Sequence, residues 1–230
     1  AEVFDAEAGH LLAGGAAGLG HGQLDALDEA ADEDGRAVFG REGVFGVECG
    51  EDPDQLFVMG QSAGGYLTQM AGFVVQPRPR ALVSFWGYGD IAGEWYSRPD
   101  LFYCQQPLVT KEEADRPGSG KLYLYCRQQG LWPKVLTGHD PQTEPRAFDP
   151  FCPVRNVTKD YPPTLLIHGT KDTDVPYELS VQMDKELTAK GVAHEFITIP
   201  DGGHGFRNKV DAEVAAKTYR QVVEFLDRYR

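Results

Sequence analysis

The stretch from Leu56 to Gly65, LFVMGQSAGG, constrains this chain more than any other. Its first four residues are apolar, a suitable length for a buried β-strand, and they run directly into a Gly-x-Ser-x-Gly turn centred on Ser62. Apolar residues then recur at helical spacing, namely Leu67, Met70, Ala71 and Val74. The order of strand, sharp turn and helix is the context in which this motif presents a nucleophilic serine.

The glycines of this motif have a steric reason. So tight a turn places Ser62 in a strained backbone conformation and brings the helix close to the strand. Gly60 and Gly64 lack the Cβ atom that would collide there. We therefore expect the Ser62 Oγ to project above the sheet at the helix N-terminus, where N–H groups favour developing negative charge. By itself, the motif also fits a glycine-rich structural turn.

Composition limits the classes of protein to which the chain can belong. A length of 230 residues suits one domain, or one domain with an insertion. The 22 basic and 35 acidic residues give a net charge of −13, which argues against a nucleic-acid or anionic-membrane partner because phosphate binding needs clustered Lys and Arg. No apolar run approaches the length of a membrane span. We expect a cytoplasmic protein, with a secreted one as the alternative; the oligomeric state is not indicated.

Cysteine and histidine spacing gives no sign of a metal site. The chain has four cysteines, Cys49, Cys104, Cys126 and Cys152, without a Cys-x-x-Cys pair. They fit reduced core thiols, or one disulfide in a secreted form. The six histidines include no His-Glu-x-x-His motif. The sequence therefore predicts neither a metal nor a cofactor.

The first 50 residues are the hardest part of the chain to interpret. Residues 9–22 are rich in Gly and Ala, and residues 23–35 are strongly acidic and compatible with a helix. Residues 44–47 fit a short strand or the end of a helix.

The chain beyond the serine turn alternates between strands and helices. Residues 81–85 form a second apolar run, and with the preceding strand and helix they predict a βαβ unit and hence a parallel sheet. Residues 164–168 and 195–199 predict two further strands. Between those two, the pattern predicts a helix that starts near Pro176, buries Leu179, Met183 and Leu187, and ends at Gly191. An amphipathic helix is predicted over residues 209–230.

A long irregular segment interrupts this alternation. From about residue 88 to about residue 160 the chain is rich in aromatic residues, Pro and Gly, with short helices predicted near 111–114 and 121–129. So long an irregular segment between two strands predicts a cap inserted over a site. A packed structural extension is the alternative interpretation.

Two loops downstream supply possible partners for Ser62. Asp172 follows the strand at 164–168, and His204 follows the strand at 195–199. Ligands of open α/β sheets bind at the carboxyl ends of the strands, and neighbouring parallel strands lie about 5 Å apart. The three side chains can therefore come within hydrogen-bonding reach, in the chain order Ser, Asp, His.

These residue types suit nucleophilic catalysis. A serine hydroxyl needs an adjacent base, and an imidazole can accept its proton near neutral pH. Asp172 would orient His204 and stabilise its protonated form. Asp174 competes for this role, although it lies closer to Pro176 and is better placed to cap the following helix. Taken singly, His204 could be a surface histidine and Asp172 a turn residue.

Three motifs together resemble the α/β-hydrolase superfamily. They are GQSAGG at residues 60–65, HGTKDTDVP at 168–176 and DGGHGF at 201–206. The likeness covers roughly residues 50–230 and is greatest to the esterase/lipase and prolyl-oligopeptidase-like branch. It implies a mostly parallel sheet flanked by helices, as one domain over residues 1–230 with a cap at about 88–160. It also implies Ser62, Asp172 and His204 as the triad and Ala63 N–H as an oxyanion donor.

The N-terminal region departs from the pattern of that family. Such esterases carry a His-Gly-Gly-Gly-type loop that supplies further oxyanion donors, and the nearest candidate here is Gly15. Few residues precede the serine strand, which indicates that the early strands are reduced or the chain is trimmed. Further candidates for substrate contact lie beside the motifs; they are Gln61, Trp86 and Val175.

Three functional hypotheses follow from these observations. The main one is a serine hydrolase that cleaves a small-molecule carboxylic ester through an acyl-enzyme intermediate. The second keeps the fold but makes the substrate a peptide, as in a prolyl-oligopeptidase-like serine peptidase. The third is a non-catalytic binding protein with a hydrolase fold, against which an intact triad argues.

Overall fold

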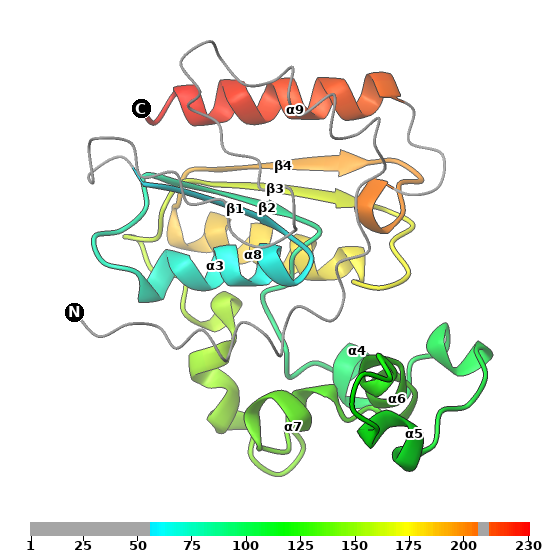
Figure 1. Cartoon of the computed structure of the whole chain (residues 1–230). Helices are drawn as coiled ribbons and strands as arrows, with labels where there is room; N and C mark the ends of the chain where they lie inside the picture. Colours follow the sequence, from blue (N-terminus) through cyan, green and yellow to red (C-terminus); the bar gives the residue numbers. More distant parts are fainter. Residues whose placement is uncertain (1–55, 207–211) are drawn as a thin grey trace. The chain divides into compact units, whose positions relative to one another are not determined.

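A parallel β-sheet forms the centre of the larger of two compact units (Figure 1). The computed structural model describes residues 56–206 and 212–230. Within them the sheet consists of β1 (Phe57–Gln61), β2 (Ala81–Phe85), β3 (Thr164–Gly169) and β4 (His194–Ile199), in that spatial order. All three strand pairs are parallel, so the four carboxyl ends lie at one edge. The predictions made for residues 1–50, including Gly15 and Cys49, lie outside the described residues.

Helices cover both faces of the sheet. The crossover helices α3 (Ala63–Val74) and α8 (Tyr177–Lys190) lie on one face, and α9 (Ala212–Asp227) lies on the other (Figure 1). Every residue of β2 and of β3 is buried. This explains why these strands read as continuous apolar runs instead of alternating patterns. The predicted parallel sheet with flanking helices is confirmed.

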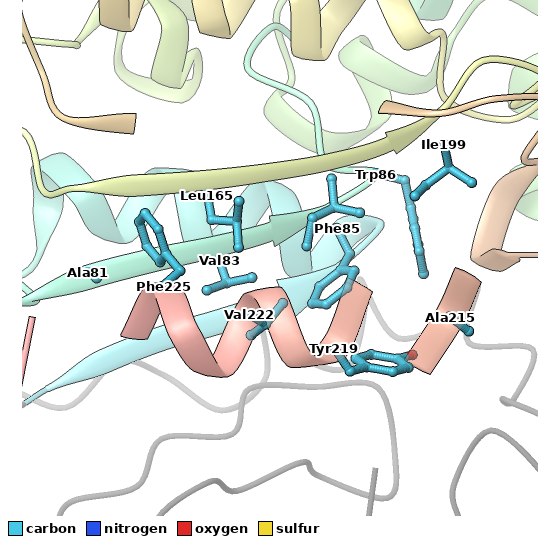
Figure 2. Packing of buried hydrophobic residues seen from close by; sticks show 11 residues of the cluster. Ala81, Val83, Phe85, Trp86, Leu165, Ile199, Ala215, Tyr219, Val222 and Phe225 are labelled. Carbon is cyan, nitrogen blue, oxygen red and sulfur yellow. The ribbon is translucent and has the colours of Figure 1, made fainter. Parts of the chain in front are cut away.

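Helix α9 covers its face of the sheet with a row of large side chains (Figure 2). Tyr219, Val222 and Phe225 are at most 4% exposed. They pack against side chains of the two central strands, among them Val83, Phe85, Leu165 and Ile167. The hydrophobic effect of this contact holds the last helix in place, because burial of each such side chain contributes about 1.5–3 kcal/mol.

Helix α3 packs on the other face through small residues. A Cβ on Gly65 would lie 2.8 Å from the carbonyl oxygen of Phe85, and one on Gly72 would lie 2.3 Å from the ring of Tyr161. Such close approach requires glycine at these two positions. The buried surface of the helix consists of Gly, Ala and polar residues together with Tyr66, so the apolar face predicted from the sequence is wrong at Val74, which is 46% exposed.

Helix α8 follows the predicted pattern. Leu179, Met183 and Leu187 are buried against the sheet. Gly191 ends the helix in the left-handed conformation, with φ of 69°.

The second compact unit comprises the described residues from Asp90 to Cys152. Its elements are α4 (Glu94–Ser97), η2 (Tyr103–Gln105), α5 (Lys111–Asp115), α6 (Leu122–Gln129), α7 (Trp132–Thr137) and η3 (Pro145–Phe151). The two helices predicted in this segment correspond to α5 and α6, whereas α4 and α7 were not predicted. That the segment caps a site stays a prediction.

A buried arginine organises this second unit. Arg127 is 1% exposed and its guanidinium lies 2.6 Å from Asp100. Four aromatic rings surround its Cζ at 4.5–5.6 Å, those of Trp95, Tyr96, Tyr103 and Tyr123. The ion pair and the cation–π contacts together compensate for removing this charge from water. The aromatic richness of the segment thus reflects, at least at these rings, a core built around one cation.

Two further observations concern membrane spans and cysteines. Within the described ranges, no helix combines the length and the apolar character needed to cross a membrane. Cys126 and Cys152 are buried free thiols, as predicted for core cysteines. The same prediction is wrong for Cys104, which is a free thiol but exposed, because it lies at the surface in η2.

The packing of α9 yields a stability prediction. Phe225→Ala removes a side chain that is 1% exposed, so we expect the free energy of unfolding to fall by about 3–5 kcal/mol. Glu224→Ala, at the exposed neighbouring position, should change it by less than about 0.5 kcal/mol. Urea denaturation followed by circular dichroism measures both values. Equal effects of the two substitutions would contradict the packing described here.

Candidate active site

Ser62 occupies the turn between β1 and α3. Its φ of 56° lies in a region that residues other than glycine rarely adopt. The strained turn is held by a hydrogen bond from the Ser62 N–H to the carbonyl oxygen of Phe85, at 2.9 Å. A Cβ on Gly60 would lie 2.4 Å from the carbonyl oxygen of Gly64, so the close approach requires glycine. The local geometry is the one that the steric argument predicted.

His204 comes from the segment after β4, which lies at the opposite end of the described strand order from β1. It begins the short helix η5 (His204–Phe206), which follows β4. Its Nε2 lies 3.0 Å from Ser62 Oγ, and its side chain is 19% exposed. Its ring centroid lies 6.0 Å from that of Trp86. The histidine is therefore packed against the core on one side while keeping a solvent-accessible edge.

Asp172 completes the set from the loop after β3. Its Oδ2 lies 2.8 Å from His204 Nδ1, the nitrogen opposite the one that faces Ser62. Its Oδ1 accepts hydrogen bonds from the backbone N–H groups of Asp174 and Val175, both at 2.9 Å. The side chain is completely shielded from solvent. An unbroken chain of polar contacts thus runs from the carboxylate through the imidazole to the hydroxyl.

The loops that carry Asp172 and His204 are fastened to each other. The Lys171 N–H donates to the carbonyl oxygen of Gly202 at 2.8 Å. A Cβ on Gly169 would lie 2.2 Å from that same oxygen, so only glycine allows the two backbones to approach so closely. These contacts position the histidine loop over the aspartate loop.

The geometry distinguishes Asp172 from Asp174. The Oδ2 of Asp174 lies 3.6 Å from His204 Nε2, the nitrogen that also faces the serine. A carboxylate on that side cannot hold Nδ1, so Asp172 is the residue placed to orient the ring. The expectation that Asp174 caps the next helix is wrong, since α8 receives no side-chain cap and Asp174 is aimed at the imidazole instead.

The surroundings of Asp172 keep it ionised. Burial acts to raise the pKa of Asp172, but hydrogen bonds from His168 and His204, with electrostatic attraction to His204, outweigh it. The net result is a pKa well below the usual range of an aspartate. A carboxylate that stays charged can stabilise a proton on His204 Nε2.

The structure places the other candidate residues as follows. Ala63 is the first residue of α3, where the N–H has no carbonyl one turn earlier to bind. Gln61 ends β1 and is half-buried. Trp86 and Val175 are 2% and 1% exposed, so their side chains belong mainly to the packed interior. Contacts of these residues with a substrate or oxyanion stay predictions.

One contact of the site was missed by the sequence analysis. His168, the first residue of the HGTKDTDVP motif, is fully buried. Its Nε2 also lies 3.2 Å from Asp172 Oδ2. The sequence places His168 near the end of β3, four residues before Asp172 in the following loop. This spacing suggested proximity, but it could not show that the ring points toward the carboxylate. In the part of the chain that the structure describes, no group of three His, Cys, Asp or Glu residues could hold a metal ion.

The fold and the site define a class of protein. A parallel sheet with Ser, Asp and His, in that chain order, on loops at its carboxyl edge is the arrangement of the α/β-hydrolases. The described part of the chain has the α/β-hydrolase fold. Residues 121–230 match the family model described as the prolyl oligopeptidase family.

Individual proteins are similar in sequence to parts of this chain. Esterase LipC of Mycobacterium tuberculosis is 25% identical over 184 residues, which cover 78% of this chain and 41% of LipC. This chain spans less than half of the length of the curated relatives it matches.

Solved structures share the fold. A protein of unknown function from Staphylococcus aureus has a TM-score of 0.59 at 21% identity, covering 76% of this chain and 65% of its own. An acylaminoacyl peptidase from Pyrococcus horikoshii has a TM-score of 0.57 at 20% identity, covering 77% of this chain and 24% of its own.

The lowered pKa of Asp172 predicts an acid-dependent loss of stability. Because the folded-state pKa lies below the unfolded-state value of about 3.9, ionised Asp172 stabilises the folded chain above that value. This contribution declines as pH falls toward the folded-state pKa. We therefore expect Asp172→Asn to lose less stability relative to wild type at pH 3 than at pH 5, measured by urea denaturation at both pH values. An equal or larger loss at pH 3 would contradict the assignment.

Proposed function

We propose that this chain is a serine hydrolase that cleaves carboxylic esters through an acyl-enzyme intermediate. The observation that carries the proposal is the continuous contact from Ser62 Oγ through His204 to Asp172, with distances of 3.0 Å and 2.8 Å. The strained turn that presents Ser62 at the start of α3 supports the same conclusion.

Acylation follows from this geometry. Ser62 Oγ attacks the ester carbonyl carbon while His204 Nε2 accepts the hydroxyl proton. The carbonyl oxygen becomes an oxyanion, which in this proposal binds the Ala63 N–H at the positive end of α3. Asp172 holds Nδ1 and stabilises the imidazolium. Collapse of the tetrahedral intermediate breaks the bond to the leaving oxygen, which takes the proton from Nε2 and departs as the alcohol.

Deacylation uses the same groups, with water as the nucleophile and Ser62 Oγ as the leaving group. A water molecule takes the place of the departed alcohol, and His204 Nε2 accepts one of its protons. The resulting hydroxyl attacks the acyl carbon, and a second oxyanion forms at the same position. When this intermediate collapses, the bond to Ser62 Oγ breaks and His204 returns the proton to the serine. The carboxylic acid leaves and the resting site is restored.

Sequence similarity supports an ester as the substrate. LipC, which is named as an esterase, matches 78% of this chain. A small-molecule ester is therefore the proposed substrate, with Gln61 and Gly15 as further candidates for substrate and oxyanion contact.

A peptide substrate is the second candidate. The match of residues 121–230 to the prolyl oligopeptidase family favours it, and the same triad chemistry cleaves amides. An amide differs in its poorer leaving group, which demands efficient protonation by His204. A purified protein that hydrolyses p-nitrophenyl esters but no aminoacyl p-nitroanilide would support the esterase. Comparable turnover of an anilide would favour the peptidase.

Removal of the nucleophile should abolish turnover. We expect Ser62→Ala to lower kcat for p-nitrophenyl acetate by roughly 10³-fold or more, because no other group takes over the covalent step. Ser119→Ala, in the other compact unit, should leave kcat within about twofold. Wild-type protein should also be labelled by a fluorophosphonate, which needs an activated serine. Equal hydrolysis by wild type and Ser62→Ala would refute this mechanism, and a protein that is neither active nor labelled would be a binding protein.

The two carboxylates near His204 should differ sharply in importance. We expect Asp172→Asn to lower kcat by about 10⁴-fold, because the amide stabilises the wrong imidazole tautomer. Asp174→Asn should lower it less than about tenfold, since Asp174 contacts the nitrogen facing the serine and leaves Nδ1 held. Steady-state hydrolysis of one ester by both variants gives the comparison. A larger loss in Asp174→Asn would reverse the assignment.

A further inference from the structure

A second histidine contacts the carboxylate of the proposed catalytic aspartate. His168 is the fifth residue of β3, is fully buried, and its Nε2 lies 3.2 Å from Asp172 Oδ2. The mechanism described above makes no use of it. A buried imidazole needs partners for both ring nitrogens, so its contacts define what it can do.

The contacts fix the tautomer of His168. Its Nε2 lies between two oxygens, the carbonyl of Val175 at 3.0 Å and Asp172 Oδ2 at 3.2 Å. Both are acceptors, so the hydrogen must be on Nε2. Its Nδ1 lies 2.7 Å from the Ser180 hydroxyl, which can donate to it. The hydrogen on Nε2 therefore lies between the Val175 carbonyl, its hydrogen-bond acceptor, and Asp172 Oδ2, while Ser180 from α8 holds the ring through Nδ1.

The same contacts complete the surroundings of the Asp172 carboxylate. Its Oδ1 accepts two backbone N–H groups, while its Oδ2 faces His204 at 2.8 Å and His168 at 3.2 Å. Oδ2 thus lies between His204, which would accept and release a proton during the reaction, and the buried His168. Without His168, Asp172 Oδ2 would have one of these two histidine partners, His204, instead of both.

We propose that His168 is a positioning residue for the hydrolase reaction, which holds Asp172 Oδ2 in line with His204 Nδ1 by donating its Nε2–H. The inference rests on the proposed function and extends it to a residue that never touches the substrate. His168 links the end of β3 to the carboxylate, and Ser180 links it to α8, so the triad is anchored in the core. The depressed pKa of Asp172, to which the His168 hydrogen bond contributes, agrees with this role.

Electrostatics distinguish this role from simple packing. Among the described residues, the titratable groups against Asp172 are His168 from β3 and His204 after β4, with Asp174 facing the far nitrogen of His204. Loss of the His168 donor removes one interaction that favours the ionised carboxylate, so the pKa of Asp172 should rise. Lost packing alone would lower stability without changing this titration.

The experiment compares His168→Leu with His168→Gln. Leucine keeps bulk but has no donor, whereas the glutamine amide can offer an N–H near the position of Nε2. We expect His168→Leu to lower kcat for p-nitrophenyl acetate by about 10- to 100-fold with KM within about twofold, as for small displacements of catalytic groups. His168→Gln should recover much of the loss. The acid limb of log kcat/KM should steepen at a higher pH in His168→Leu than in wild type, because protonation of Asp172 adds a second inactivating proton.

Two further variants serve as controls. Leu187→Ala creates a cavity under the same helix α8 without contacting Asp172, and it should lower the melting temperature while leaving kcat and the slope of the acid limb unchanged. Ser180→Ala removes the hydrogen bond between the Ser180 hydroxyl and His168 Nδ1. It should lower kcat, as His168→Leu does, but by a smaller factor. Carbon-13 NMR of the Asp172 carboxyl carbon measures its titration independently of turnover.

The outcomes separate this inference from the proposed function. An upward shift of the Asp172 titration in His168→Leu, with reduced kcat and recovery in His168→Gln, would support it. An unchanged titration, or losses of kcat no greater than in Leu187→Ala, would overturn it while leaving the hydrolase assignment intact. Wild-type protein without turnover or fluorophosphonate labelling would overturn the hydrolase assignment, and this inference with it.

Discussion

The parallel pairing of four strands is the constraint on which the rest of the structure depends. Because all four described strands run the same way, the loops after β1, β3 and β4 emerge at one edge. That edge gathers Ser62, Asp172 and His204, which are far apart in the chain. The hydrophobic contacts of α9 on one face and of α3 and α8 on the other keep the sheet in this register. A one-residue slip would turn the serine turn away from its partners.

Burial of Asp172 is the main electrostatic cost of the site. An isolated carboxylate in such surroundings would take up a proton, and a neutral acid could not stabilise an imidazolium. Two backbone N–H groups and two histidines offset this cost and keep the residue ionised. The short loop after β3 supplies the backbone donors, so the chain that follows Asp172 also holds it. Stability and chemistry therefore depend on the same set of contacts.

Much of this arrangement could be predicted from the sequence, and the exceptions have physical reasons. The strands were evident from apolar runs, and the convergence of three side chains followed from their places after parallel strands. The choice between Asp172 and Asp174 depended on how the loop bends around Gly169 and Gly202, which a residue pattern does not reveal. The face of α3 was mispredicted at Val74 because the helix buries mainly Gly, Ala and polar residues, which an apolar pattern does not mark. Arg127 gave no periodic signal, since its partners come from several short elements. The roles of the site residues and of Gly15 stay predictions.

Direct trapping of the acyl-enzyme tests the central claim most simply. The purified protein would be mixed with p-nitrophenyl acetate, quenched in acid within one turnover, digested and analysed by mass spectrometry. The account predicts a burst of p-nitrophenol and an acetyl group on the peptide that contains Ser62, with no such adduct in His204→Ala. Steady turnover with the acetyl group on another residue, or an equal adduct in His204→Ala, would contradict it.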